Sequence, residues 1–305
     1  MSIPGRWCVT LAALMALTSC SSESTYDLYY LGGQSNMDGY GFVDELPVEL
    51  RGEVDRVMIF TGLTAEDDDP ARGVGMWERI RPGHGTGFRT DGTANQLSDR
   101  FGPELTFAST IAELKPGSRI AIIKYSRGGS GLAPGVGYGS WDPDYADGEG
   151  INQYDHARVT IRNALAHSDI DGDGNPDRLI PAGIIWMQGE ADAEHSQDVA
   201  DAYEGNLARL MSLLREELGV DDLPVVIGKI TDSGMADDGS VMDFCGTVQR
   251  AQEAFTDSDD CATLVTATEE CEHLDDGWHY DTEGYLRLGA AFAEAALELE
   301  RTCHP

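Results

Sequence analysis

Apolar residues along the 305-residue chain form short runs that alternate with longer segments of helical periodicity. Six runs have the length of strands, and several are apolar almost throughout, as is typical of strands buried on both faces of a parallel sheet. These runs are residues 28–31, 56–60, 119–125, 182–187, 224–230 and 262–268. Helical periodicity covers residues 104–114, 153–166, 199–218, 244–255 and 283–301. The alternation predicts one doubly wound, three-layer α/β/α domain with a mostly parallel sheet of five to six strands.

Two long segments between these elements show neither periodicity. Residues 61–100 are rich in glycine, aspartate and arginine, and residues 127–150 are rich in glycine and aromatic residues. Both follow the end of a predicted strand. Because ligands of open α/β sheets bind outside the carboxyl ends of the strands, we expect these segments to shape a substrate cleft.

The N-terminal residues resemble the export signal of a bacterial lipoprotein. A basic Arg6 precedes a mostly apolar stretch, residues 9–17, that is far too short to span a bilayer. Residues 17–20 read Leu-Thr-Ser-Cys, which resembles a lipobox and implies cleavage before Cys20 and lipidation of that cysteine. The alternative is an ordinary secretory peptide with an incidental cysteine.

We therefore expect a signal peptide at residues 1–19, a short linker at 20–26 and a single domain at 27–305. No other segment is apolar enough to cross a membrane. The mature protein is expected to be exported, to be held to a membrane only by the lipid on Cys20, and to face the periplasm or the cell surface. Its oligomeric state stays open.

The composition is strongly acidic, with 54 acidic residues against 21 basic ones and a formal net charge of −33. Lysine occurs only as Lys115, Lys124 and Lys229, and the absence of a basic patch disfavours nucleic acid as a partner. A solvating acidic surface and a cationic partner both fit this balance. We favour the acidic surface, because dissolved salt would screen the repulsion between its charges.

Four cysteines remain in the mature chain, an even number for a protein of an oxidising compartment. They lack a paired C-x-x-C spacing, which disfavours a zinc site and favours two disulfides. Cys245 and Cys271 should lie at the carboxyl edge of the sheet, whereas Cys261 and Cys303 should lie at the opposite edge. The expected pairs are therefore Cys245–Cys271 and Cys261–Cys303.

Three strand ends carry residues that suit catalysis. Two glycines close the first predicted strand, and Ser35 follows in a turn that brings its hydroxyl to the carboxyl edge. Gly128 and Gly129 follow a second strand, where a backbone N–H can approach a ligand closely. Gln188 ends a third and can donate a side-chain N–H to a developing oxyanion. Each of these residues taken alone also has a structural explanation. Ser35 could be a helix N-cap, the two glycines could form a simple turn, and Gln188 could face water at a strand end.

His279 lies just before the last predicted helix, and Asp276 lies three residues earlier. At this spacing the carboxylate can fold back to the imidazole Nδ1, which fixes the tautomer and leaves Nε2 free to take a serine proton. A surface loop with a capping acid has the same spacing, so the pair is a weak signal by itself.

Four short blocks occur in a fixed order: Gly-Gly-Gln-Ser-Asn-Met (32–37), Lys-Tyr-Ser-Arg-Gly-Gly (124–129), Trp-Met-Gln-Gly-Glu-Ala-Asp (186–192) and Asp-Gly-Trp-His (276–279). Over about residues 27–300 the chain resembles the SGNH-hydrolase superfamily, and most of all its carbohydrate-esterase branch of sialate O-acetylesterase and acetylxylan esterase-like enzymes. Four ordered blocks are far more specific than any single one. The resemblance implies a flavodoxin-like sheet.

The resemblance also implies roles for individual residues. Ser35 would be the nucleophile, His279 the general base and Asp276 the group that orients it. The implied oxyanion hole consists of the backbone N–H groups of Ser35 and of Gly128 or Gly129, and of the Gln188 side chain. No metal or other cofactor is needed for catalysis.

Two positions depart from the wider superfamily, in which an aspartate often precedes the serine and an asparagine holds the third block. Gln34 and Gln188 stand in those places, which fits the carbohydrate-esterase branch. Ala191 stands where that branch often has serine, and we expect activity to survive this change. Gln34 and Glu190 are expected to support the site, Glu190 by accepting hydrogen bonds.

Residues 169–177 form a separate acidic motif. Oxygen-bearing side chains recur at alternate positions around a glycine, as in the first half of an EF-hand-like calcium loop. The ligands this predicts are Asp169, Asp171, Asp173, Asn175 and Asp177. Ile180 stands where a complete EF-hand has its bidentate glutamate. We expect a structural calcium ion that braces the strand before Gln188, with a solvated acidic turn as the alternative.

The leading interpretation is an exported O-acetylesterase that hydrolyses acetyl esters on a carbohydrate. The alternatives are a peptidoglycan or general short-chain carboxylesterase, and a catalytically dead, glycan-binding surface lipoprotein, against which the intact triad argues. Arg127 or Arg89 is expected to meet a substrate carboxylate, or else to pair with surface acids. Trp141, Tyr138 and Tyr145 are expected either to stack on sugar rings or to fill the core of their loop. The sequence does not choose the sugar.

Overall fold

The sheet predicted from the apolar runs is present in the computed structural model of the chain, which describes residue 1, residues 23–146 and residues 151–303. Within these ranges seven strands form one sheet in the order β11-β10-β9-β1-β8-β3-β4. They are β1 (Ser24–Gly33), β3 (Val57–Thr61), β4 (Trp77–Arg79), β8 (Arg119–Ser126), β9 (Asp177–Met187), β10 (Val225–Gly228) and β11 (Ala262–Val265). All pair in parallel except β4, which is antiparallel to β3. The predicted lipobox and Cys20 lie outside the described residues.

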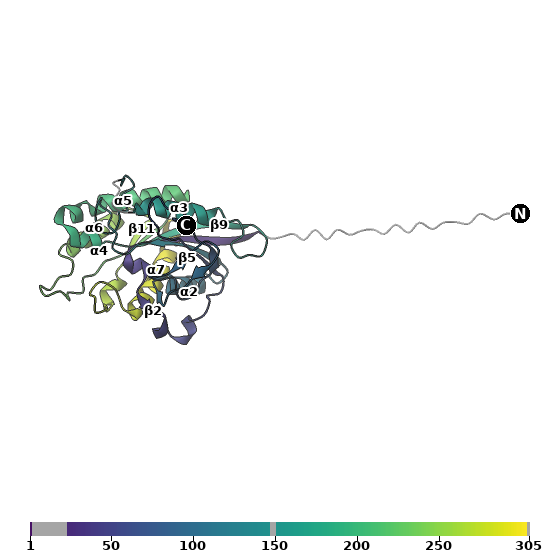
Figure 1. Ribbon diagram of the computed structural model, residues 1–305, viewed down its shortest axis with the longest axis horizontal. Helices are drawn as coiled ribbons and strands as arrows, with labels where there is room; N and C mark the ends of the chain where they lie inside the picture. The colour runs from purple at the N-terminus through teal and green to yellow at the C-terminus, as the bar shows by residue number, and fades with distance from the viewer. Residues whose placement is uncertain (2–22, 147–150, 304–305) are drawn as a thin grey trace.

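Helices cover both faces of this sheet and complete the predicted three layers (Figure 1). On one face, α2 (Glu104–Leu114) packs against α7 (Thr282–Cys303). On the other face, α5 (Gln197–Leu218) packs against α3 (Gln153–Leu165) and α6 (Cys245–Ser258). In the described parts of the chain, none of the helices has both the length and the apolar character needed to cross a membrane.

The remaining helices and strands are shorter. Two short helices follow strand ends: α1 (Ser35–Asp38) follows the carboxyl end of β1, and α4 (Glu190–His195) follows that of β9. The others are β2 (Gly41–Phe42) paired with β7 (Arg100–Phe101), β5 (Arg89–Thr90) paired with β6 (Asn95–Gln96), and the 3-10 helices η1 (Val43–Glu45), η2 (Val48–Leu50) and η3 (Ala267–Glu270).

All six predicted strands are present, but two expectations need correction. The seventh strand, β4, lies inside segment 61–100 and has only three residues, too few to show a period. The predicted linker at 20–26 is also too long, because β1 begins at Ser24 and Tyr26 pairs with both neighbouring strands. Tyr26 is 2% exposed, so burial of its ring favours extension of the strand towards the N-terminus.

The strand order places β1 between β8 and β9. A flavodoxin-like sheet has the order 2-1-3-4-5, and the strands β8-β1-β9-β10-β11 follow this order as predicted. The strand β3 is added beside β8, and β4 is added beside β3. The chain passes from one side of β1 to the other between β8 and β9. At the carboxyl end of β1, Gly33 is in register with Ser126 of β8 and Met187 of β9. The crevice where such folds bind ligands therefore lies at these three strand ends.

The ends of α5 show how local chemistry sets the element boundaries. The side chain of Ser196 caps its first turn by accepting a hydrogen bond from the Val199 N–H, so the helix begins before the predicted residue 199. Gly219 follows in the left-handed region, with φ +76°, and its N–H bonds to the Arg215 carbonyl. A serine cap and a glycine stop thus bracket the apolar face that packs on the sheet.

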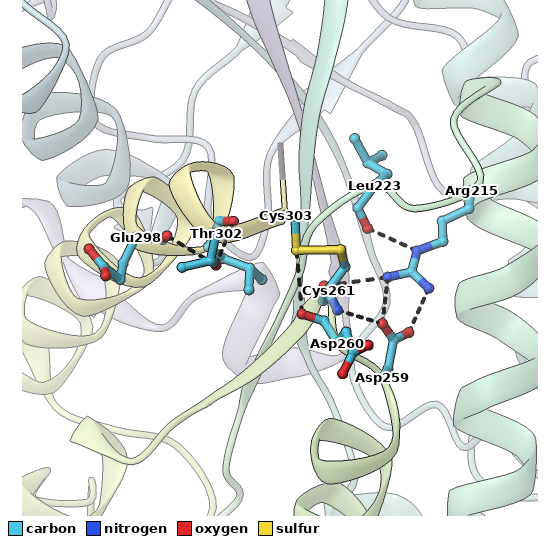
Figure 2. Close-up of a disulfide and its surroundings, with 9 residues drawn as sticks. Arg215, Leu223, Asp259, Asp260, Cys261, Glu298, Thr302 and Cys303 are labelled. Atoms are coloured by element: carbon cyan, nitrogen blue, oxygen red, sulfur yellow. Dashed lines mark hydrogen bonds and ion pairs between the residues drawn. A yellow bond between two sulfur atoms is a disulfide. The ribbon is translucent and has the colours of Figure 1, made fainter. Parts of the chain in front are cut away.

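One of the two predicted disulfides is present. Cys261, at the start of β11, is joined to Cys303 at the end of α7 (Figure 2). Beside it, the Arg215 guanidinium donates to the Asp259 carboxylate at 2.6 Å and to the Leu223 carbonyl at 2.8 Å (Figure 2). The bond and these contacts tie the amino edge of the sheet to the helices on both of its faces.

The predicted Cys245–Cys271 pair is wrong, because both residues are free thiols. Cys245 begins α6, on the face that carries α5, and burial raises the pKa of its thiol to about 12. Cys271 follows η3 and donates to the Gly284 carbonyl of α7, on the opposite face. The two cysteines share an edge of the sheet, as predicted, but the sheet separates them.

Candidate active site

The carboxyl ends of β1 and of its two neighbours, β8 and β9, bring predicted catalytic segments together. Gly33 ends β1 with φ +146°, and a Cβ at this position would lie 1.9 Å from the Met187 carbonyl oxygen. Only glycine therefore permits β1 to turn this close to β9. Ser35 follows as the first residue of α1 and is 7% exposed.

A cavity of about 870 Å³ opens over these strand ends. It is lined by three groups that the sequence places far apart, namely Ser35 after β1, Gly128 after β8 and His279 before α7. Gln34 and Arg127 line it as well. Ala191 of the third block lines it too, so all four ordered blocks meet at one place, as the resemblance implies.

His279 is held by the acid that the sequence assigns to it. Its Nδ1 lies 2.7 Å from Oδ2 of Asp276, whose Oδ1 accepts hydrogen bonds from the N–H groups of Trp278 and His279. Burial raises the pKa of the Asp276 carboxyl, but these hydrogen bonds outweigh it and lower the pKa overall. The carboxylate therefore stays ionised, and Nε2 is the ring nitrogen left to accept a proton.

Tyr40 fixes the plane of the imidazole. Its ring stacks on His279 with 3.6 Å between ring centroids and 7° between planes, and it lines the same cavity. No spacing or motif in the sequence points to this contact, since Tyr40 is remote from His279 in the chain. The hydrogen bond to Asp276 and the stack on Tyr40 leave the imidazole little rotational freedom.

The structure distinguishes the two glycines that follow β8. A Cβ on Gly128 would lie 3.4 Å from Cβ of Ser35, so this residue packs directly beside the predicted nucleophile. A Cβ on Gly129, where φ is +66°, would instead meet the Tyr138 ring at 2.7 Å. Of the two alternatives for the oxyanion hole, Gly128 is the one whose position suits it.

The structure places Gln188, for which the resemblance implies an oxyanion role, outside the lining of the cavity. The residue is fully buried and does not line the cavity, and its Nε2 donates to Asp192 at 2.6 Å and to the Ser130 carbonyl at 3.1 Å. Both amide protons are therefore in use. Asp192 also accepts from the backbone N–H groups of Leu132 and Ala133, so Gln188 and Asp192 together hold the loop after β8.

The predicted supporting residues accept hydrogen bonds at the base of the site. Oε1 of Gln34 accepts from the N–H groups of Gly189 at 3.3 Å and Ala191 at 3.2 Å, which fixes the turn between β9 and α4. Oε1 of Glu190 accepts from Nδ2 of Asn36 at 2.7 Å. The expectation that Glu190 accepts hydrogen bonds agrees with this contact.

Asn36 links the segment of Ser35 to the loop of His279. Its Nδ2 also donates to the Trp278 carbonyl at 3.1 Å, and its Oδ1 accepts from the Tyr285 hydroxyl at 2.7 Å. Glu190, which braces Asn36 from α4, is 2% exposed, and burial raises the pKa of its carboxyl to about 7. Three elements are thereby joined directly behind Ser35.

A buried ion pair supports the other end of α1. Nζ of Lys124 lies 2.8 Å from Glu104 and 2.8 Å from the Asp38 carbonyl, and the lysine side chain is fully buried. Burial raises the pKa of the Asp38 carboxyl, which lines the cavity. The sequence did carry a signal here, because Lys124 is a charged residue within an otherwise apolar strand.

The residues expected to contact substrate separate into two groups. Arg127 lines the cavity, its buried Nε has no hydrogen-bond partner, and it forms no ion pair with any carboxylate in the described ranges. Arg89 lines an adjacent cavity of about 150 Å³ that Arg127 also borders. Trp141 is core instead, because it is 1% exposed and its Nε1 donates to the Ser130 hydroxyl at 2.9 Å. A stacking role for Trp141 is therefore wrong.

The acidic loop lies at the amino end of β1, where Ser24 pairs with Asp177. The carboxylates of Asp169, Asp171 and Asp177 offer oxygens within 4.8 Å of one another. Asp173 lies outside this group and accepts hydrogen bonds from the backbone and side-chain N–H groups of Asn175. The geometry leaves three of the five predicted ligands near a common point.

Two of these three carboxylates already have partners, whereas Oδ1 of Asp177 is buried without a hydrogen-bond partner. Asp169 accepts hydrogen bonds from the backbone N–H groups of Gly172 and Gly174, at 2.8 and 2.9 Å. Asp171 forms an ion pair with Arg119, also at 2.8 Å. Calcium at this loop stays a prediction.

Comparisons with known proteins agree on a family and a fold. The sequence model of the family described as carbohydrate esterase, sialic acid-specific acetylesterase, matches residues 25–298. An Arabidopsis thaliana relative, described as a probable carbohydrate esterase, is 26% identical over 114 residues, which are 37% of this chain. The match spans only 39% of the length of that relative.

Two solved structures share the fold. The crystal structure of an Arabidopsis thaliana protein has a TM-score of 0.61 at 18% identity, covering 91% of this chain and 99% of its own. A carbohydrate acetylesterase from Xanthomonas citri has a TM-score of 0.58 at 16% identity, covering 90% of this chain and 57% of its own. At these identities the likeness shows the fold alone.

Proposed function

The chain belongs to the carbohydrate esterase family of sialic acid-specific acetylesterases and is thus an ester hydrolase, and from this premise we propose that it removes O-acetyl groups from sugars through Ser35, His279 and Asp276. One observation carries the proposal. Ser35 and an imidazole locked by Asp276 and Tyr40 line the same cavity, with Gly128 against the serine.

In the first step the Ser35 hydroxyl oxygen attacks the carbonyl carbon of the acetyl ester while Nε2 of His279 takes its proton. The carbonyl electron pair moves to the oxygen, and ionised Asp276 stabilises the imidazolium that forms. The oxyanion accepts hydrogen bonds from the backbone N–H groups of Ser35 and Gly128. A donor of this kind contributes about 3 kcal/mol to the transition state.

In the second step the oxyanion collapses and the bond to the sugar oxygen breaks. His279 gives its proton to that oxygen, so the sugar leaves as a free hydroxyl and Ser35 keeps the acetyl group. Water then attacks the acyl-enzyme with His279 as base. The products are acetate and regenerated Ser35, and one water is consumed for each ester cleaved.

The Arg127 side chain supports an acidic sugar as the preferred substrate. Asp38 and Glu194 also line the cavity, and neither forms an ion pair with Arg127. Because no carboxylate of the described ranges pairs with this guanidinium, Arg127 is suited to binding a carboxylate of the substrate. The adjacent cavity that Arg127 shares with Arg89 has room for such a group.

The proposal is tested by acetate release from O-acetylated sialic acid, acetylated xylan and acetylated peptidoglycan. We expect the highest kcat/KM for sialic acid and the loss of nearly all release in Ser35→Ala. Ser212→Ala, an exposed serine on α5, serves as the control and should keep full activity. Retained activity in Ser35→Ala would overturn the mechanism, and a preference for acetylated xylan would overturn the acidic sugar.

Export as a lipoprotein is proposed from the sequence alone. Labelled palmitate should enter the native protein expressed in a bacterium, and Cys20→Ala should abolish the labelling. Labelling that persists in this variant would show another attachment site.

A further inference from the structure

Tyr138 differs from every other exposed apolar side chain in the described ranges. The large hydrophobic side chains exposed there are Met1, Val48, Leu114, Tyr138, Leu165 and Met235. Tyr138 is the one aromatic among them, it is 74% exposed, and it lines the active-site cavity. An exposed aromatic ring at the mouth of a cavity is a feature of ligand contact rather than of core packing.

The backbone of Tyr138 is held in place. Its N–H donates to the Gly129 carbonyl at 2.7 Å, and its carbonyl accepts from Nε2 of Gln153 at 3.2 Å. A bridge between Ser130 and Gly137 closes the same loop. The ring is therefore carried by a fixed segment, so a ligand would not have to order this part of the backbone.

The ring also has a fixed relation to the reaction centre. Gly129 lies against it, so closely that a Cβ there would be 2.7 Å from Cδ2 of Tyr138. The preceding residue, Gly128, lies against Ser35. The neighbour of the ring and the neighbour of the nucleophile are therefore consecutive residues, and Tyr138 lines the same cavity as Ser35.

We propose that Tyr138 is a platform on which a pyranose ring of the substrate stacks while the acetyl ester lies at Ser35. The inference rests on the proposed function and deepens it, because it names the residue that separates sugar esters from small acetate esters. A pyranose presents C–H groups on its faces and hydroxyl groups around its rim, so its face can cover an aromatic ring while the rim keeps its hydrogen bonds. The contact needs no charge on the sugar.

Tyr138→Ala, Tyr138→Phe and Tyr138→Trp test the platform, with Leu165→Ala as a control for removal of an exposed apolar side chain elsewhere. We expect Tyr138→Ala to raise KM for O-acetylated sialic acid and for acetylated xylotriose about tenfold, with a much smaller change in kcat. Phenylalanine and tryptophan should keep KM near the native value. Ethyl acetate, which has no ring, should show a much smaller change. An equal loss with ethyl acetate, or an unchanged KM for both sugars, would overturn the inference.

A binding measurement separates failure of the platform from failure of the proposed function. Calorimetric titration of Ser35→Ala with the same two glycans needs no turnover, and adding Tyr138→Ala should weaken the affinity about tenfold. If the native protein releases no acetate while this loss is observed, the esterase proposal fails and the platform stands. Equal affinity in both variants, or no binding of either glycan to Ser35→Ala, would overturn the platform.

Discussion

Strand β1 carries a predicted site at each of its ends, and the two are built differently. At the carboxyl end, Ser35, Gly128 and His279 come from three distant segments and line one cavity. At the amino end, the acidic groups come from one short segment, residues 169–177. Both sites follow from sequence motifs, but the first faces a cavity of about 870 Å³, whereas in the second three carboxylates of one loop lie within 4.8 Å of one another.

The hydrogen bonds explain the difference. Behind the cavity, supporting groups bond to one another, as Glu190 does to Asn36 and Gln188 does to Asp192. In the acidic loop, the expected ligands themselves are bonded, as Asp169 is to the backbone N–H groups that follow it. In a site assembled from distant segments, the residues that hold the backbone can differ from the residues that react. In a local loop, the same side chains must hold the backbone and bind the ion.

The largest expected effect is at the orienting acid. Asp276→Asn should lower kcat about 10³- to 10⁴-fold, because an amide cannot stabilise the imidazolium and favours the wrong tautomer of His279. Asp275→Asn, an exposed neighbour, is the matched control. Thermal unfolding should show both variants folded. Activity within tenfold of native in Asp276→Asn would remove Asp276 from the proposed triad.

A smaller effect should separate the two glycines. Gly128→Ala places a methyl group 3.4 Å from Cβ of Ser35, an ordinary contact, so the fold should survive while kcat falls on the order of tenfold or more. Gly129→Ala forces alanine to φ +66° and brings its Cβ within 2.7 Å of the Tyr138 ring, so it should cost about 1 kcal/mol of stability or more. Steady-state kinetics and urea unfolding of both variants measure this contrast. A larger loss of kcat in Gly129→Ala would reverse the oxyanion assignment.

The support behind the cavity should make stability depend on pH. Burial raises the pKa of Glu190 from 4.5 to about 7, so between these values the folded state binds more protons than the unfolded state. Stability from this group is thus fully present below pH 4.5 and is lost as pH rises through 7, by up to about 3 kcal/mol. Asp192, whose pKa burial raises to about 6, adds to the same trend.

Glu190→Gln keeps an acceptor for Asn36 and removes the titration. Urea unfolding at pH 5 and pH 8 should show a smaller loss of stability in this variant than in the native protein. Glu194→Gln, an exposed acid on the same helix, is the control. An identical difference between the two pH values in native protein and Glu190→Gln would show that Glu190 does not titrate in this range.

The smallest expected effect is at the acidic loop. Calcium added to EDTA-treated protein should raise the Tm by about 2–4 °C if binding contributes about 1 kcal/mol, without a change in kcat. Asp169→Asn should abolish the shift. An unchanged Tm in native protein would mean that this loop binds no calcium, and the calcium prediction would be withdrawn.

Much of the fold was predictable because buried strands need apolar residues along their whole length. The runs at 119–125 and 182–187 became β8 and β9 for that reason. The three-residue β4 has no such run, and its pairing depends on the neighbouring β3. The cysteines show the same limit, since the sequence assigned Cys245 and Cys271 to one edge of the sheet but not to its opposite faces.

The placement of Ser35 and His279 at one cavity, with Asp276 beside His279, was predictable because motifs fix both the type and the order of these residues. The sequence could not show that Asp192 takes an amide proton of Gln188, because that depends on the turn between β9 and α4. The same holds for Trp141, because the sequence of its aromatic loop does not show whether the ring packs into the core or faces a ligand. Tyr40 carries no signal at all, since its stack on His279 exists only in the folded chain.

The role of Ser35 as nucleophile is tested most directly by covalent labelling. Native protein treated with diethyl p-nitrophenyl phosphate is digested and mapped by mass spectrometry, with Ser35→Ala and Asp276→Asn in parallel. We expect one phosphoryl adduct, on Ser35, that appears in step with the loss of acetate release, is slow to form in Asp276→Asn and is absent in Ser35→Ala. Inactivation with the adduct on another residue, or an unlabelled Ser35 in a protein that releases acetate, would contradict the proposed mechanism.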